Sequence, residues 1–207
     1  MFPNVLSGEQ ARVLELLSRE QECGRFYLAG GTGLALRFGH RQSEDFDFFS
    51  PAPFGNSVLK EKMSHLAPLT VLQDSEGTLT VEIESVRASF LNYPYPLLGP
   101  PESTPWGFAI ASNEDIGAMK LSAVASRGSK RDFFDLFVLC SGPLPFGALF
   151  EAFRRKFASV RFDEYHLLRS LSYFDDAESE PDLRMIRPIT WEQVKQFFRT
   201  LAAKRME

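Results

Sequence analysis

The stretch FYLAGGTGLALRFGHRQSEDFDFFS, Phe26 to Ser50, determines the fold that the sequence predicts. Its first part, RFYLAG, predicts a strand that ends at Gly30, and TGLALRFG predicts a short helix stopped by Gly39. The following DFDFF alternates charged and aromatic residues, which is typical of a strand with one polar and one buried face. The stretch therefore predicts the order strand, glycine turn, helix, strand.

The neighbouring segments extend this α/β pattern. SGEQARVLELLSRE predicts a helix with Ser7 as N-cap and Gln10 completing a capping box. NSVLKEKMSHL predicts a second helix, and LTVLQD, TLTVEIES and VRASFLNY predict three strands. The proline-rich YPYPLLGPPESTP cannot sustain regular structure, since proline removes backbone donors, and it is the best boundary candidate.

After this boundary the pattern becomes helical. NEDIGAMKLSAVASRG predicts a helix capped by Asn113 and ended by Gly128. KRDFFDLFVLC, PFGALFEAFRRKFA, DEYHLLRSLSYF and TWEQVKQFFRTLAAK predict further helices. We expect an α/β domain at residues 1–110 followed by a helical domain at residues 111–207.

The composition indicates a globular intracellular protein. Of 207 residues, 44% are hydrophobic, and no apolar run is long enough to cross a membrane. The N-terminus lacks the pattern of a secretory signal. Cys23 and Cys140 lie far apart, which favours reduced thiols in the cytoplasm, and the spacing typical of a zinc site is absent.

Charge is distributed unevenly. The formal net charge is −4, and residues 1–100, with 8 basic and 12 acidic side chains, account for all of it. Residues 120–161 instead hold 8 basic and 3 acidic side chains, a local excess of +5. This basic run predicts either a face for a phosphate-rich partner or a set of solvated helix surfaces.

The glycine turn is a candidate phosphate cradle. Gly30 and Gly31 allow a close backbone approach, and the N-terminus of the following helix favours an anion. The hydroxyl of Thr32 adds a hydrogen-bond donor. The alternative is a purely structural turn.

Asp45 and Asp47 suggest a metal site. On a strand they project to one face while Phe46 and Phe48 pack into the core behind them. Two ionised carboxylates repel each other unless a cation lies between them, and Mg²⁺ binds one or two carboxylates together with phosphate oxygens. The alternative is a strand that begins in a polar turn, with both carboxylates solvated.

A second set of charged residues lies in the helical half. Lys120 and Arg127 share one helix face, and Asp132 and Asp135 share a face of the next helix. The apolar residues around the two aspartates predict burial. A buried aspartate needs a partner, and Lys120, Arg127 or Arg131 can supply it. The alternative to a catalytic role is an ion-pair network that stabilises the helices.

These two blocks, YLAGGTGLALRFGHRQSEDFDFFS and DIGAMKLSAVASRGSKRDFFDLFVL, resemble the AbiEii/AbiGii toxin family of nucleotidyltransferases. That family belongs to the DNA polymerase β-like superfamily, and the resemblance covers roughly residues 1–140. It implies a polymerase β-like nucleotidyltransferase core, a mixed sheet with flanking helices, followed by a C-terminal helical bundle. It also implies a toxin of a toxin–antitoxin or phage-defence pair.

The resemblance assigns roles to individual residues. Asp45 and Asp47 would bind Mg²⁺ and take part in catalysis, as would Lys120 and Asp132. A nucleoside triphosphate would be bound by the glycine turn, Gly30, Gly31 and Thr32, and by Lys120. Ser43, which lies next to the acid pair, and Arg127, which shares a helix face with Lys120, are further candidates for this binding from their positions in the sequence. An RNA acceptor resembling tRNA, or a protein acceptor, and a cognate antitoxin would be the partners, with no membrane involved.

One departure from the superfamily pattern keeps two alternatives open. Many polymerase β-like transferases place a third carboxylate on a later strand, where VRASFLN offers Ser89. Glu82 and Glu84 are predicted to share a face of the preceding strand, and His40 is predicted to lie in a loop or at the surface. The alternatives are a non-catalytic nucleotide- or partner-binding protein, and a phosphotransferase that uses the same metal site.

Overall fold

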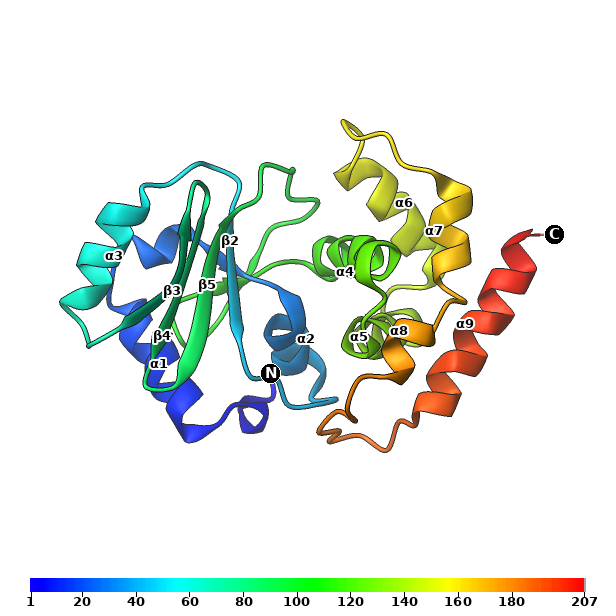
Figure 1. Cartoon of the computed structure of the whole chain (residues 1–207), viewed down its shortest axis with the longest axis horizontal. Coiled ribbons are helices and arrows are strands. Elements are labelled where there is room, and N and C mark those ends of the chain that lie inside the picture. Colours follow the sequence, from blue (N-terminus) through cyan, green and yellow to red (C-terminus); the bar gives the residue numbers. More distant parts are fainter. Residues whose placement is uncertain (207) are drawn as a thin grey trace. The chain divides into compact units, whose positions relative to one another are not determined.

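Two units make up the chain, Met1–Ser112 and Asn113–Glu207, in a computed structural model that describes residues 1–206. The first unit contains a mixed sheet with flanking helices, and the second unit is helical (Figure 1). This architecture confirms the predicted fold class. Among the described residues, no helix has the length and apolar character needed to cross a membrane.

The sheet of the first unit has the strand order β3-β4-β5-β2-β1-β7-β6. Strand β2 is central and runs parallel to β5 but antiparallel to β1, while β1 runs parallel to β7. The strands are β1 (Tyr27–Leu28), β2 (Phe46–Ser50), β3 (Thr70–Ser75), β4 (Thr78–Ile83), β5 (Val86–Asn92), β6 (Glu102–Ser103) and β7 (Ala109–Ile110).

Local signals explain the helices of the first unit. Ser7 and Gln10 form the predicted capping box at the start of α1. Helix α2 ends at Gly39, which adopts a left-handed conformation with φ 59°. The helices are η1 (Pro3–Val5), α1 (Gly8–Ser18), η2 (Cys23–Arg25), α2 (Gly30–Phe38) and α3 (Asn56–Ser64).

An aromatic core lies behind β2. Phe46 and Phe48 are fully buried, and the Phe48 ring stacks on Phe90 of β5 with centroids 5.1 Å apart. Phe108 packs on Phe48 at 4.7 Å. Since side chains alternate along a strand, this packing turns Asp47 to the opposite face of the sheet. The predicted burial of Phe46 and Phe48 behind Asp47 is therefore confirmed, whereas Asp45 directly precedes β2, and a face shared with Asp47 stays a prediction.

The second unit packs its helices around a separate aromatic core. Phe133 contacts Phe174, Trp191 and Phe198, with ring centroids between 5.1 and 5.8 Å apart. Helix α4 ends before Gly128, as predicted. The helices are α4 (Asn113–Arg127), α5 (Lys130–Cys140), α6 (Phe146–Lys156), α7 (Glu164–Ser170), α8 (Asp175–Glu178) and α9 (Trp191–Met206).

Three local predictions were wrong. The proline-rich segment is not free of regular structure, because Glu102–Ser103 pairs with β7. His40 lies in a loop after α2, as predicted, but it is fully buried rather than at the surface. Glu84 lies in the turn between β4 and β5 with φ 49°, so it does not share a strand face with Glu82.

Candidate active site

The glycine turn of the first unit meets Asp47 at the start of α2. Gly30 has φ 64°, and a Cβ atom at this position would lie 2.5 Å from the Asp47 Oδ2 atom. Any larger residue would therefore be strained in its backbone and would collide with the carboxylate. Ala29, the N-cap of α2, provides no side-chain hydrogen bond to the first turn. The helix N-terminus and a carboxylate are thus held close together.

Thr32 holds the loop that carries Asp45. Its side chain is buried, and its hydroxyl donates to the Asp45 carbonyl and lies 2.8 Å from the Ser43 Oγ atom. The hydroxyl of Thr32 is therefore engaged within the protein in this structure. A direct bond from Thr32 or Ser43 to a phosphate stays a prediction, and the contacts present favour a role in positioning Asp45.

Arg41 is a functional candidate that the sequence reasoning missed. The residue is buried, and its guanidinium occupies the space that a Cβ atom of Gly31 would need. A buried guanidinium beside the first turn of a helix adds positive charge where an anion is already favoured. The sequence feature that could have indicated Arg41 is Gly31, which has no Cβ atom and so leaves space for the guanidinium.

Asp45 and Asp47 stay the predicted ligands of Mg²⁺, and their surroundings can be compared with what that ion needs. Both are half-buried and flank the buried Phe46; Asp47 lies on β2, and Asp45 directly precedes that strand. Mg²⁺ needs one or two protein carboxylates and takes its remaining oxygens from substrate phosphates and water. The pair beside the N-terminus of α2 therefore fits Mg²⁺ that arrives with a triphosphate.

The neighbouring strand carries no third carboxylate beside Asp47. In the sheet register Ser89 of β5 lies directly opposite Asp47, and its hydroxyl is 3.2 Å from that of Thr80 on β4. Glu84 forms an ion pair with Arg12 at 3.2 Å. Within residues 1–206 no group of three or more His, Cys, Asp or Glu side chains is arranged to hold a metal.

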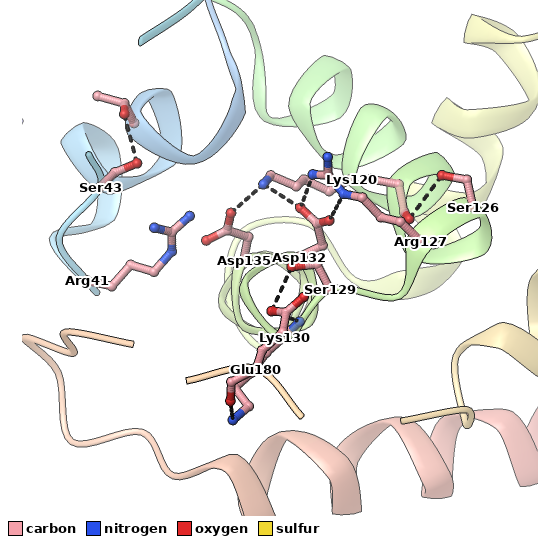
Figure 2. A network of polar contacts seen from close by, with 12 residues as sticks. Arg41, Ser43, Lys120, Ser126, Arg127, Ser129, Lys130, Asp132, Asp135 and Glu180 are labelled. Carbon is pink, nitrogen blue, oxygen red and sulfur yellow. Dashed lines mark hydrogen bonds and ion pairs between the residues drawn. The ribbon is translucent and has the colours of Figure 1, made fainter. Parts of the chain in front are cut away.

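In the second unit, Lys120 and Arg127 of α4 converge on Asp132 of α5 (Figure 2). The Lys120 Nζ atom lies 2.7 Å from Asp132 Oδ1 and 2.7 Å from Asp135 Oδ2. Arg127 Nε donates to Asp132 Oδ2 at 2.8 Å. Both aspartates are fully buried, so the predicted shared faces and the predicted need for partners are confirmed.

The electrostatics of this cluster favour a positioning role for Asp132. Burial raises the pKa of Asp132, but the ion pairs with Lys120 and Arg127 outweigh it and hold the pKa below its ordinary value. A general base works best with a pKa near the working pH, so Asp132 is poorly suited to accept a proton from an acceptor. Its geometry instead fixes the ammonium group of Lys120.

The basic run at residues 120–161 is not an open basic surface. Six of its eight cations form ion pairs with carboxylates, and four of these carboxylates, Glu114, Asp115, Glu164 and Asp182, lie outside residues 120–161. These cations are Lys120, Arg127, Lys130, Arg154, Arg155 and Lys156. These ion pairs weaken the interpretation of this run as a face for an RNA backbone, which stays a prediction.

The sequence as a whole matches the family model for the nucleotidyl transferase AbiEii toxin of type IV toxin–antitoxin systems, over residues 12–104 and 71–204. It is 37% identical over 206 residues to the uncharacterised protein aq_aa25 of Aquifex aeolicus, covering 98% of each chain.

Among solved structures, the fold is similar to that of MenT4, a nucleotidyltransferase toxin of Mycobacterium tuberculosis. The TM-score is 0.60 at 18% identity, covering 95% of this chain and 86% of MenT4. It is also similar to an H. pylori protein proposed to be a nucleotidyltransferase, with a TM-score of 0.57 at 17% identity over 98% and 99% of the two chains. The match to the family model shows that this chain belongs to the AbiEii nucleotidyltransferase toxin family.

Proposed function

We propose that this chain uses Mg²⁺ to transfer a nucleotide from a nucleoside triphosphate to an RNA acceptor resembling tRNA. The observation that carries the proposal is the pair of half-buried carboxylates beside the glycine turn, where Gly30 leaves room for Asp47. The reaction needs nucleoside triphosphate and RNA, so its proposed place is the cytoplasm.

The glycine turn, Thr32 and the two aspartates of the first unit each have a chemical task in this proposed reaction. Backbone N–H groups of Gly30 and Gly31 bind the triphosphate, assisted by the dipole of α2. Asp45 and Asp47 would hold Mg²⁺, which would supply Lewis-acid chemistry at the α-phosphate and lower the pKa of the attacking hydroxyl. Thr32 keeps the Asp45 backbone in place through the hydrogen bond to its carbonyl.

The second unit contributes positive charge. By resemblance to the family, Lys120 neutralises charge on the phosphates as pyrophosphate leaves. Asp132 and Asp135 each lie 2.7 Å from its ammonium group and restrict its position. Arg127 is more exposed, with 53% of its side-chain surface accessible, and can bind phosphate while retaining the ion pair to Asp132.

Nucleoside triphosphate binding is expected to require a divalent cation. Without one, the two carboxylates repel the triphosphate, so the affinity in chelator should fall at least about tenfold, equivalent to about 1.4 kcal/mol. Calorimetric titration with and without Mg²⁺ measures this difference. Equal affinity in the presence of chelator would contradict the two-aspartate site.

The alternative to be tested is a member of this family that binds nucleotide without turnover. Ser89 lies opposite Asp47, on a strand where many polymerase β-like transferases place a third carboxylate. Incubation with each labelled nucleoside triphosphate and total cellular RNA separates the two functions. Cation-dependent binding without label in RNA or protein would favour the alternative, and mass spectrometry of the added group would distinguish nucleotide transfer from phosphate transfer.

Membership of the toxin family also motivates a cognate antitoxin as partner. Expression of the chain alone should slow bacterial growth, and Asp47→Ala should restore it, since the toxicity depends on the metal-binding carboxylate. Growth curves with matched expression levels measure the effect. Normal growth of several hosts expressing the wild-type chain would argue against the toxic activity.

A further inference from the structure

A pocket of about 560 Å³ lies within the second unit, between the C-terminal end of α4 and the α7–α8 segment. Its volume suits a ligand the size of a nucleotide. Its walls combine aromatic, cationic and hydroxyl side chains. Those that matter here are Tyr165, Tyr173, Arg169, His166 and Arg127.

Two tyrosines give the pocket exposed aromatic surface. Tyr165 is 59% exposed and Tyr173 is 52% exposed, although both are large rings in a unit with an extensive buried aromatic core. An exposed ring that lines a pocket can stack on a nucleobase, and such stacking tolerates any base because each has a π-face. The tyrosines therefore favour a ligand with a planar, polar-edged ring.

Cations lie beside these rings. The Arg169 guanidinium carbon is 5.8 Å from the centroid of the Tyr165 ring, and His166 Nε2 lies 3.2 Å from the Ala125 carbonyl at the end of α4. Arg127 also lines the pocket. A base stacked on Tyr165 would place its phosphate near Arg169, so the pocket suits a nucleotide better than a neutral aromatic ligand.

The carboxylates of the pocket do not cancel this preference. Asp163 accepts hydrogen bonds from the Tyr165 and His166 backbone N–H groups and serves as the N-cap of α7. Asp176 is exposed and can accept a hydrogen bond from the amino group of a base or from a ribose hydroxyl.

Arg127 connects the pocket to the buried cluster described above. It lines the pocket and also donates to Asp132, which holds Lys120. A nucleotide bound here would therefore contact Arg127, whose ion pair with Asp132 joins the pocket wall to the buried cluster, although Lys120 and Asp132 do not line the pocket. Since six of the eight cations of residues 120–161 are held in ion pairs, this pocket is the better candidate for contact with an acceptor strand.

We propose that this pocket binds an unpaired nucleotide of a single-stranded nucleic acid, with the base stacked on Tyr165 and Tyr173 and the phosphate bound by Arg169. The proposal rests on the proposed function, in which the strand is the RNA acceptor. It assigns acceptor binding to α7 and the following turn, separately from the triphosphate site at the glycine turn.

The test measures binding of a fluorescein-labelled 12-nucleotide RNA of random sequence to the full chain by anisotropy. The double variant Tyr165→Ala/Tyr173→Ala should bind at least about tenfold more weakly, because stacking contributes about 1–3 kcal/mol per base. The double Phe variant should bind like wild type, since stacking needs no hydroxyl. Unchanged binding by the double Ala variant would overturn the proposal.

Arg169→Ala should weaken binding and reduce the slope of log affinity against log salt by about 0.7, as expected for one lost phosphate contact to a single strand. Arg199→Ala is the matched control: Arg199 lies 5.4 Å from the Phe174 ring centroid, a similar cation–π contact, but does not line the pocket. Equal effects of the two substitutions would contradict a phosphate contact at Arg169.

Two further measurements distinguish the possible failures. Binding of a DNA strand of matching composition shows whether the pocket prefers an RNA or a DNA nucleotide. Tighter binding of RNA supports the acceptor assignment, and tighter binding of DNA overturns it. Triphosphate affinity of the double Ala variant should equal that of wild type. If the chain binds triphosphate with Mg²⁺ but the double Ala variant binds RNA like wild type, the pocket proposal alone is rejected. If the double Ala variant loses RNA binding but the wild-type chain shows no cation-dependent triphosphate binding, the proposed function alone is rejected.

Discussion

Replacing Asp47 with asparagine is expected to reduce nucleotide transfer by at least about a thousandfold while the protein stays folded. A metal ion contributes several kcal/mol of transition-state stabilisation, and about 1.4 kcal/mol corresponds to a factor of ten. Asparagine has the same shape, so it fits the narrow space beside Gly30. Loss of one carboxylate also removes repulsion with Asp45, so the free energy of unfolding should not fall.

Label incorporation per folded molecule and urea unfolding together measure the two parts of this result. Ser89→Ala is the matched control, because Ser89 lies opposite Asp47 on the adjacent strand and removes only a hydroxyl that contacts Thr80. It should retain most activity. Unfolding of Asp47→Asn under conditions where wild type is folded would indicate a structural role, and full turnover would exclude Asp47 from the metal site.

Replacing Lys120 with methionine is expected to lower both stability and transfer. The substitution leaves Asp132 and Asp135 buried without the ammonium group that lies 2.7 Å from each of them. Removing one partner of a buried ion pair costs about 3–5 kcal/mol of unfolding free energy. Transfer per folded molecule should also fall, because the charge proposed to neutralise the phosphates is absent.

A variant of a second buried ion pair distinguishes the loss of stability from the loss of transfer. Lys156 lies 2.7 Å from Asp115, and both side chains are fully buried within the same unit. Lys156→Met should lower stability by a similar amount but leave transfer per folded molecule near wild type. If both lysine variants keep wild-type turnover when folded, Lys120 has a structural role alone.

A charge-preserving variant keeps the test informative should Lys120→Met fail to fold. Lys120→Arg retains the positive charge for Asp132 and Asp135 and should remain folded, but its larger planar head group displaces the donor. Turnover below that of wild type with stability largely preserved would support a role in transfer. Wild-type turnover of Lys120→Arg would contradict a requirement for the ammonium geometry.

Much of the local structure could be predicted because its causes lie within a few residues. The capping box of Ser7 and Gln10 and the left-handed Gly39 determine where α1 begins and α2 ends. Alternation around Phe46 and Phe48 likewise predicts the buried and polar faces of β2. Short elements such as α8 and β6 were not predicted, because they contain too few residues to show a periodic pattern.

Only the tertiary structure shows which charged and polar side chains are buried. The sequence places Lys156 in a basic run, yet its partner Asp115 is 41 residues away. His40 follows a helix end, where exposure is the usual expectation, but it is fully buried. Ion pairing and burial depend on which distant segments pack together, and periodicity does not report that.

The sequence by itself determined the family resemblance and the order of strand, glycine turn and helix. It also determined the carboxylate pair Asp45 and Asp47, because each of these features depends on contiguous residues. The tertiary structure alone decided that Ser89 lies opposite Asp47 and that Tyr165 and Tyr173 line one pocket. The physical reason is that strand register and helix packing result from the burial of many apolar side chains together, so they belong to no single segment.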